Sequence, residues 1–235
     1  MALLKKPGCI FVFSLFTVLF SCSARIDGVV GSGGAAEISI QTALEPRTYA
    51  LLSSLMGFMG EETDAQVLDS RSISRSMASA SGIRSVSLKN TSPSALEGTI
   101  SISNVANFLS PGDSFISFKE EAAASNILIV LDRSSAPLLI SKFSPEVEDY
   151  LSALMAPAVL GETMTRQEYL DLVSSVYSRP LANEIAAARI RAFIDFPRPV
   201  IEVVGGTGVG KRAEFSIPLL DILVLEQPLR YEVKW

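Results

Sequence analysis

A glycine-rich segment in the last third of the chain matches the spacing of a phosphate-binding loop. Gly205 to Lys211 reads GGTGVGK, which fits the pattern G-x-x-x-x-G-K and follows an apolar segment. In such a loop, a Ser or Thr after the lysine binds magnesium and a helix begins there, so that its N-terminus faces the phosphates. Here Arg212 takes the magnesium position, and Ala213 to Ile217 alternates like a strand. We therefore interpret the segment as a hairpin turn and expect no nucleotide ligand.

Carboxylate clusters are the next candidates for chemistry. They are Glu61-Glu62-Thr63-Asp64, Glu120-Glu121, and Glu146 with Glu148-Asp149. Each lies at an expected loop or helix start, where acidic side chains stabilise the helix dipole. None offers the dense oxygen array that calcium requires. The sequence also lacks the S-x-x-K and G-x-S-x-G motifs of serine nucleophiles.

The chain contains no histidine and two cysteines, Cys9 and Cys22. The lack of histidine removes the usual general base, the Ser-His-Asp arrangement and the commonest ligand of transition metals. Both cysteines lie in the N-terminal apolar region, so the rest of the chain has no thiol for a disulfide, a zinc site or a nucleophile. We expect no catalytic residue, no cofactor and no metal, and a protein that is not an enzyme.

The N-terminal region has the layout of an export signal. Lys5 and Lys6 precede a mostly apolar run from Cys9 to Phe20. This run is shorter than the roughly 20 residues that cross a bilayer, and it fits the apolar core of a secretory signal. A plainly secreted protein and a retained anchor are the alternatives to the interpretation that follows.

Leu19-Phe20-Ser21-Cys22 resembles the lipobox of bacterial lipoproteins. The resemblance implies that residues 1–21 are a signal peptide, and that Cys22 becomes the acylated N-terminus and the lipid anchor. Two or more acyl chains hold a protein stably on a membrane. We therefore expect a protein anchored in the cell envelope, at the periplasmic face or the cell surface, with the membrane as its first partner.

The composition of the remaining residues indicates where the globular domain begins and which partners it lacks. Residues 22–36 are rich in Gly, Ser and Ala, and predict a flexible tether with a span of about 20 Å. Residues 37–235 contain no further linker of this kind and predict a single globular domain. The net charge is −5, with basic residues scattered, so we expect no nucleic-acid partner.

The hydrophobic pattern predicts an α+β fold, a mostly antiparallel sheet with a block of amphipathic helices. The expected strands are Glu37–Thr42, Ile83–Leu88, Leu96–Ser103, Ser114–Lys119, Asn126–Leu131, Ala136–Ser141, Val200–Val204, Ala213–Ile217 and Leu229–Trp235. The expected helices begin at Pro46, Asp64, Ser144 and Thr165, with another after Pro180. The strands around residues 126 and 136 are expected to form a central hairpin, and the first and last strand groups to share a sheet.

Apolar spacing assigns a buried face to several of these helices. The first has Tyr49, Leu52, Met56 and Met59 on one stripe, either core or a methionine-rich binding groove. The helix from Thr165 has a capping box with Glu168, and its expected inward residues are Tyr169, Leu172, Val173, Val176 and Tyr177. The last helix has an expected face of Ala186, Ile190, Phe193 and Ile194.

Three function classes remain open. The first is a non-enzymatic binding or scaffolding module of the cell envelope, with an envelope protein as partner. The second is a carrier or chaperone whose apolar cavity holds a lipid or an exported chain. Its walls would be the helix Tyr49 to Met59 and the helices after Ser144. The third is an enzyme. A large apolar cavity favours the carrier, and a packed core with an exposed apolar patch favours the module.

Overall fold

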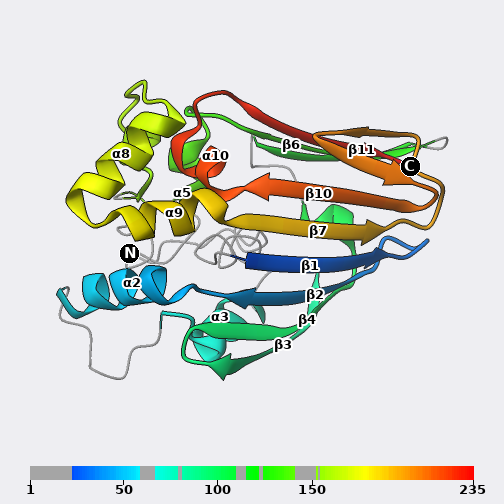
Figure 1. Cartoon of the computed structure of the whole chain (residues 1–235). Helices are drawn as coiled ribbons and strands as arrows, with labels where there is room; N and C mark the ends of the chain where they lie inside the picture. Colours follow the sequence, from blue (N-terminus) through cyan, green and yellow to red (C-terminus); the bar gives the residue numbers. More distant parts are fainter. Residues whose placement is uncertain are drawn as a thin grey trace, which may run out of the picture.

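Two facing β-sheets, with α2, α5, α8, α9 and α10 gathered towards one end, make up most of the described part of the chain (Figure 1). A computed structural model describes residues 23–58, 67–78, 81–109, 115–121, 124–140, 152 and 154–235. The first sheet has the strand order β3 (Ile83–Ser92), β4 (Ala95–Ile102), β2 (Ala36–Ala43), β1 (Ser23–Val30), β7 (Arg189–Asp195), β10 (Arg212–Pro218), β9 (Gly206–Val209). The second has the order β5 (Ile116–Glu120), β6 (Ser125–Leu131), β11 (Leu229–Lys234), β8 (Glu202–Val204).

Neighbouring strands are antiparallel except for β1 and β7, which are parallel. The α+β class with mostly antiparallel sheets in a single domain is therefore confirmed. The described helices are α2 (Pro46–Phe58), α3 (Ser70–Ala78), α4 (Val105–Phe108), α5 (Ala136–Ile140), α7 (Ala156–Val159), α8 (Arg166–Val176), α9 (Arg179–Ala187) and α10 (Leu219–Val224). Within the described residues, no helix is long and apolar enough to cross a membrane.

The expected tether at residues 22–36 is wrong, because Ser23–Val30 is a central strand of the large sheet. It pairs with β2 along its whole length and with β7 on its other side. Ala24, Ile26 and Gly28 alternate inwards and are buried. The Gly and Ser residues that suggested a linker form the β1–β2 turn, where the Gly31 amide donates to the Ala35 carbonyl at 2.7 Å. Residues 23–36 are therefore part of the fold, which extends before residue 37.

The expected helix after Pro180 is shorter than the pattern indicated. α9 ends at Ala187, and Ile190, Phe193 and Ile194 belong to the strand β7. Apolar residues also occur at every second position of Arg189–Asp195, which is a strand pattern. The segment forms a strand because β1 pairs with one of its edges and β10 with the other. Ile190 and Ile194 therefore point to the core face, whereas Phe193 lies on the other face with the Arg25 guanidinium 4.5 Å from its ring centre.

The expected hairpin partner Ala136–Ser141 is also wrong, because Ala136–Ile140 forms helix α5. Asp132 starts this helix: its Oδ1 accepts from the Ser135 amide at 2.9 Å and from the Ser134 hydroxyl at 2.6 Å. A carboxylate that caps a turn in this way favours a helix over a strand hairpin. The apolar run is therefore buried as a short helix, with Leu139 and Ile140 in the core.

We expect Asp132→Ala to lower the free energy of unfolding by about 1 kcal/mol near neutral pH. Bonds from the Ser134 hydroxyl and the Ser135 amide lower the pKa of the Asp132 carboxyl below its ordinary 3.8. A lowered folded pKa means that this contribution is complete above the unfolded pKa and is lost as the pH falls through the folded pKa. Urea unfolding should show the difference at neutral pH and a smaller one in strong acid. An equal difference at both pH values would contradict the cap, and Asp132→Asn is the control that keeps an acceptor oxygen.

Most remaining elements agree with the sequence. The strands around residues 83 and 96 form the expected hairpin, and the capping box of Thr165 and Glu168 is present at the start of α8. The first and last strand groups share the large sheet through β2 and β10, although β8 and β11 lie in the small one. The predicted starts at Asp64 and Ser144 lie outside the described residues, and α3 is observed from Ser70.

The predicted buried face of α8 is only half correct. Tyr169 and Val173 are buried, but Leu172, Val176 and Tyr177 are exposed. Tyr169 also donates its hydroxyl to the Leu154 carbonyl at 2.9 Å, and burial raises its pKa strongly. One strip of the helix thus faces the core, Leu172 and Val176 form an exposed apolar edge one turn apart beside it, and Tyr177 is the first residue after the helix. In α2, Leu52 is buried as expected, and Met59 lies outside the described residues.

Candidate functional site: an apolar cavity between the sheets

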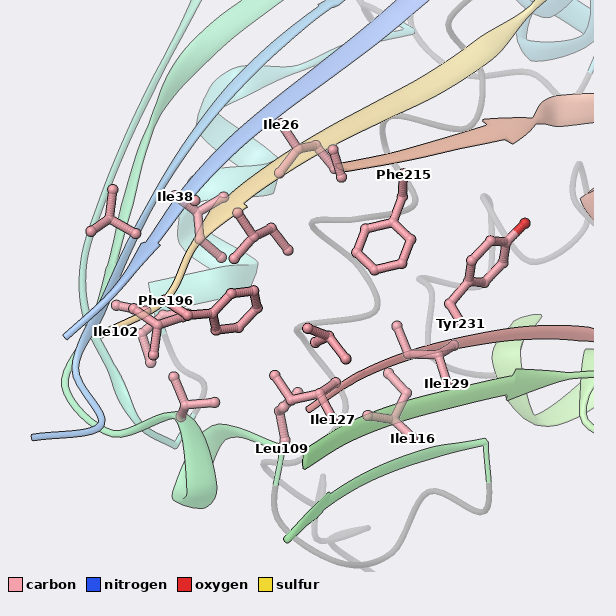
Figure 2. Close-up of a pocket in the computed structure, with 18 of the residues that line it drawn as sticks. Ile26, Ile38, Ile102, Leu109, Ile116, Ile127, Ile129, Phe196, Phe215 and Tyr231 are labelled. Carbon is pink, nitrogen blue, oxygen red and sulfur yellow. The ribbon is translucent and has the colours of Figure 1, made fainter. Parts of the chain in front are cut away.

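A cavity of about 150 Å³ lies between the two sheets (Figure 2). Its walls come from β1, β2, β4, β7 and β10 of the large sheet, from β5, β6 and β11 of the small one, from α4, and from Leu109 and Phe196 beside these elements. The labelled lining residues in Figure 2 are Ile26, Ile38, Ile102, Leu109, Ile116, Ile127, Ile129, Phe196, Phe215 and Tyr231. Almost every group that faces this space is a hydrocarbon.

Two small residues account for the empty volume. Gly28 and Ala192 lie on the neighbouring strands β1 and β7, at inward positions where the flanking inward residues are mostly isoleucine. The three atoms nearest to a Cβ added at Gly28 all belong to the side chain of Ile194, at 3.5 Å or more. The closest neighbour of this position is therefore on the adjacent strand β7 and not on the opposite sheet. Protein interiors are normally close-packed, so an unfilled space here is a candidate binding site for a ligand.

Glu232 is the one charged residue among the described residues that line the cavity. Its carboxylate accepts from the Asn126 amide at 2.6 Å and also pairs with Arg230. Arg230 lies two residues before Glu232 on β11, and Asn126 of β6 pairs with Lys234, two residues after it, so both share the face of the small sheet opposite to Tyr231 and Val233. These bonds from the Asn126 amide and the Arg230 guanidinium lower the pKa of the Glu232 carboxyl. Its charge is therefore compensated by groups outside the cavity.

Tyr231 contributes a neutral ring to the wall. Burial raises the pKa of its phenol to about 12, so the hydroxyl stays protonated throughout the physiological range. Its ring meets Phe215 edge-on, with the centroids 6.0 Å apart. The two aromatic rings join the small sheet to β10 of the large one, which fixes the separation of the sheets at this side.

An aromatic cluster closes the end of the cavity near the β1–β2 turn. Trp235 is 3% exposed, and its ring centroid lies 4.4 Å from that of Phe196 and 6.2 Å from that of Phe118. Two backbone hydrogen bonds hold Trp235 against Ser125, at 2.8 and 3.0 Å. Because Phe196 also lines the cavity, the single tryptophan of the chain is one ring away from any ligand there.

A polar hollow adjoins this end of the cavity. Val30 and Val105 line both spaces. The hollow adds Glu120, Glu121 and Arg198, whose Nη2 donates to the Ser125 hydroxyl at 3.1 Å. The arrangement places an apolar cavity beside a site with charged donors and acceptors. A molecule with an apolar chain and a polar end would match both.

The glycine-rich segment has the hairpin geometry that the sequence indicated. Gly205 connects β8 of the small sheet to β9 of the large one, and a strand rather than a helix follows Lys211. Gly205 has φ +75°, and a Cβ there would lie 2.5 Å from the Arg230 carbonyl oxygen. Glycine at position 205 thus allows the chain to cross from the small sheet to the large one close to the backbone of β11.

The other candidates from the sequence do not assemble into a site. Cys22 and the clusters at residues 61–64 and 146–149 lie outside the described residues. Of the predicted carboxylates, Glu120 and Glu121 reach the polar hollow. No group of three or more His, Cys, Asp or Glu residues that could hold a metal is found in the described ranges.

The described lining residues do not come from the walls that the sequence predicted for a carrier. They belong to strands, to α4, and to Leu109 and Phe196 beside these elements, and none comes from the described parts of the helix from Tyr49 or of the helices after Ser144. Two of the lining strands were not expected, because the pattern indicated a tether at β1 and a helix over most of β7. The available signal was the small residue in the middle of each alternating apolar run, Gly28 and Ala192.

The fold and the site together define a two-sheet α+β domain with an apolar cavity. The sequence matches no protein-family model and no curated protein. Among solved structures, it is similar to the NMR structure of the folded domain of LppM from Mycobacterium tuberculosis, with 10% sequence identity and a TM-score of 0.41. The similarity covers 90% of this chain and 87% of that one. A score this low fixes neither a shared fold nor a shared function.

Proposed function

We propose that the protein is an envelope lipoprotein that carries a lipid, with the acyl chain held between its two sheets. The observation that supports this most is the cavity of about 150 Å³ with hydrocarbon walls. An engineered protein cavity of similar volume and lining stays dry and binds benzene. This feature separates the carrier from a scaffolding module with a fully packed core, which was the preferred hypothesis from sequence.

The size of the cavity indicates what kind of ligand it takes. Burial of about five methylene groups would contribute about 4 kcal/mol, equivalent to a dissociation constant of about 1 mM. An apolar chain alone would therefore bind weakly. Tighter binding requires a polar end, and the hollow with Arg198, Glu120 and Glu121 lies where that end would emerge. The proposed ligand is an amphiphile with one chain segment inside.

The test is co-purification from detergent-solubilised cell envelope, with the bound molecules identified by mass spectrometry. We expect an acyl-chain lipid in stoichiometric amount. A protein recovered without lipid but with a stoichiometric envelope protein would contradict the carrier and favour the scaffolding module. The exposed apolar edge of α8 is the observation that favours this second candidate.

The proposed membrane anchor predicts a direct labelling result. Cys22→Ala should abolish incorporation of a fatty-acid analogue, because the acyl chains are attached through this residue. Cys9→Ala is the matched control and should leave labelling unchanged, because Cys9 leaves with the signal peptide. Gel fluorescence of cells fed with the analogue measures both. Labelling that survives Cys22→Ala would refute the anchor.

A further inference from the structure

The position of Ser23 determines which end of the fold lies next to the anchor. Ser23 follows Cys22 directly and is the first residue of β1. It pairs with Ala43, just before α2, and with Arg189, just after α9. The chain from the anchor therefore enters the fold at the end where the helices gather (Figure 1). The strand begins immediately, so no tether separates this end from the membrane.

The same end presents exposed apolar side chains. Leu172 and Val176, one turn apart on α8, are 46% and 61% exposed, and Tyr177, the residue that caps the helix, is 52% exposed. α8 packs on α9, and the two helices project from the end of the sheets at which β1 begins (Figure 1). Ordinary surface apolar residues are scattered singly, whereas these three lie within six residues at the end of one helix.

Hydrogen bonds and an ion pair connect the helices at the end of the fold where β1 begins, which we call the helical end. Glu184 on α9 accepts from the Thr48 amide at 3.0 Å and from the Thr48 hydroxyl at 3.1 Å, in the first turn of α2. Arg47 adds an ion pair with Glu184 at 3.3 Å. The helices on either side of the β1 entry point are therefore tied together, and α8 is fixed to them through α9.

We propose that this helical end docks on the bilayer that carries the anchor, with the exposed side chains of Leu172, Val176 and Tyr177 inserted among the headgroups. An apolar strip at the surface of a membrane-held protein adds buried area to the acyl chains. The proposal rests on the anchor at Cys22, a part of the function proposed above, and not on the cavity.

Exposed apolar residues at the other end do not compete for this membrane. Val29 and Val209 lie there, next to the β1–β2 and β9–β10 turns. At about 3.3 Å per residue, the far end of β1 is about 23 Å from Ser23. Docking through the helical end would turn the polar hollow, which lies beside the β1–β2 turn, away from the bilayer.

Single-cysteine labelling tests the orientation, because the chain beyond Cys22 has no thiol. Val176→Cys and Val209→Cys are matched exposed valines, 61% and 81% exposed, at opposite ends. Each full-length protein is purified from membranes, labelled with an environment-sensitive dye and returned to phospholipid vesicles. The unsubstituted protein corrects for any thiol at Cys9 or Cys22.

We expect a blue-shifted emission and loss of access to a water-soluble quencher for the dye at position 176, and water-like emission at position 209. Water-like emission at both positions, or a blue shift at position 209 alone, would overturn the docking. A dye at position 176 that is already shielded in detergent, without vesicles, would also overturn it, because this shielding indicates a protein partner. Fatty-acid labelling of the same samples distinguishes the causes: acylated protein with an exposed position 176 refutes docking alone, and unacylated protein refutes the anchor as well.

Discussion

Ala192→Phe should weaken binding of the proposed lipid at least about tenfold while the protein stays folded. Ala192 lies between Ile26 of β1 and Phe215 of β10, and it faces the cavity. The substitution adds a phenyl ring, and a cavity of about 150 Å³ accommodates a benzene-sized group. Exclusion of only two methylene groups of a ligand costs about 1.6 kcal/mol, which is already more than tenfold in affinity.

The measurement is the amount of co-purified lipid, together with urea unfolding. Because the ring enters an existing void, the free energy of unfolding should stay within about 1 kcal/mol of the wild type. Ala43→Phe is the control, since Ala43 is exposed on the outer face of β2 and should leave lipid content unchanged. A folded Ala192→Phe protein that keeps the wild-type lipid content would show that the ligand lies elsewhere.

Gly205→Ala should lower the free energy of unfolding by about 2–5 kcal/mol. The φ of +75° disfavours any L side chain, and the new Cβ would lie 2.5 Å from the Arg230 carbonyl oxygen and 2.7 Å from the Tyr231 ring. Neither the backbone oxygen nor the packed ring can move away without a further cost in free energy. Gly205 also joins the two sheets, so the strain acts on the spacing that creates the cavity.

Gly210→Ala is the matched control in the same glycine-rich segment. Its φ is +61°, but a Cβ there meets no atom within 4 Å, so only the conformational cost of about 1–2 kcal/mol applies. Urea unfolding of both variants separates the two contributions. An equal loss in both would show that contact with Arg230 and Tyr231 is not what requires glycine at position 205.

The sequence predicted correctly those elements that are determined by residues close together in the chain. The capping box at Thr165 and Glu168 fixes the start of α8 through bonds within one turn, and the alternation of Leu229 to Trp235 predicts β11 with Val233 and Trp235 buried. The sequence therefore determined these elements correctly. The class of the fold follows from their order along the chain.

The errors arose where a distant partner decides the local structure. The Gly- and Ser-rich stretch after Cys22 becomes a strand because β2 and β7 pair with it on both sides. The period-two pattern from Arg189 prevails over a competing helical pattern for the same reason. The cavity depends on which residues face each other across two sheets. A pattern along a single chain does not carry that information.

Quenching of Trp235 by a fatty acid brominated in mid-chain tests the central claim most directly. Trp235 is the single tryptophan, and the ring of Phe196, on the cavity wall, lies tilted against it with the ring centroids 4.4 Å apart. The account predicts saturable quenching in the wild type, its retention in Ala43→Phe and its loss in Ala192→Phe. Trp235 fluorescence that is unchanged in the wild type, or quenched equally in Ala192→Phe, would contradict a lipid chain between the sheets.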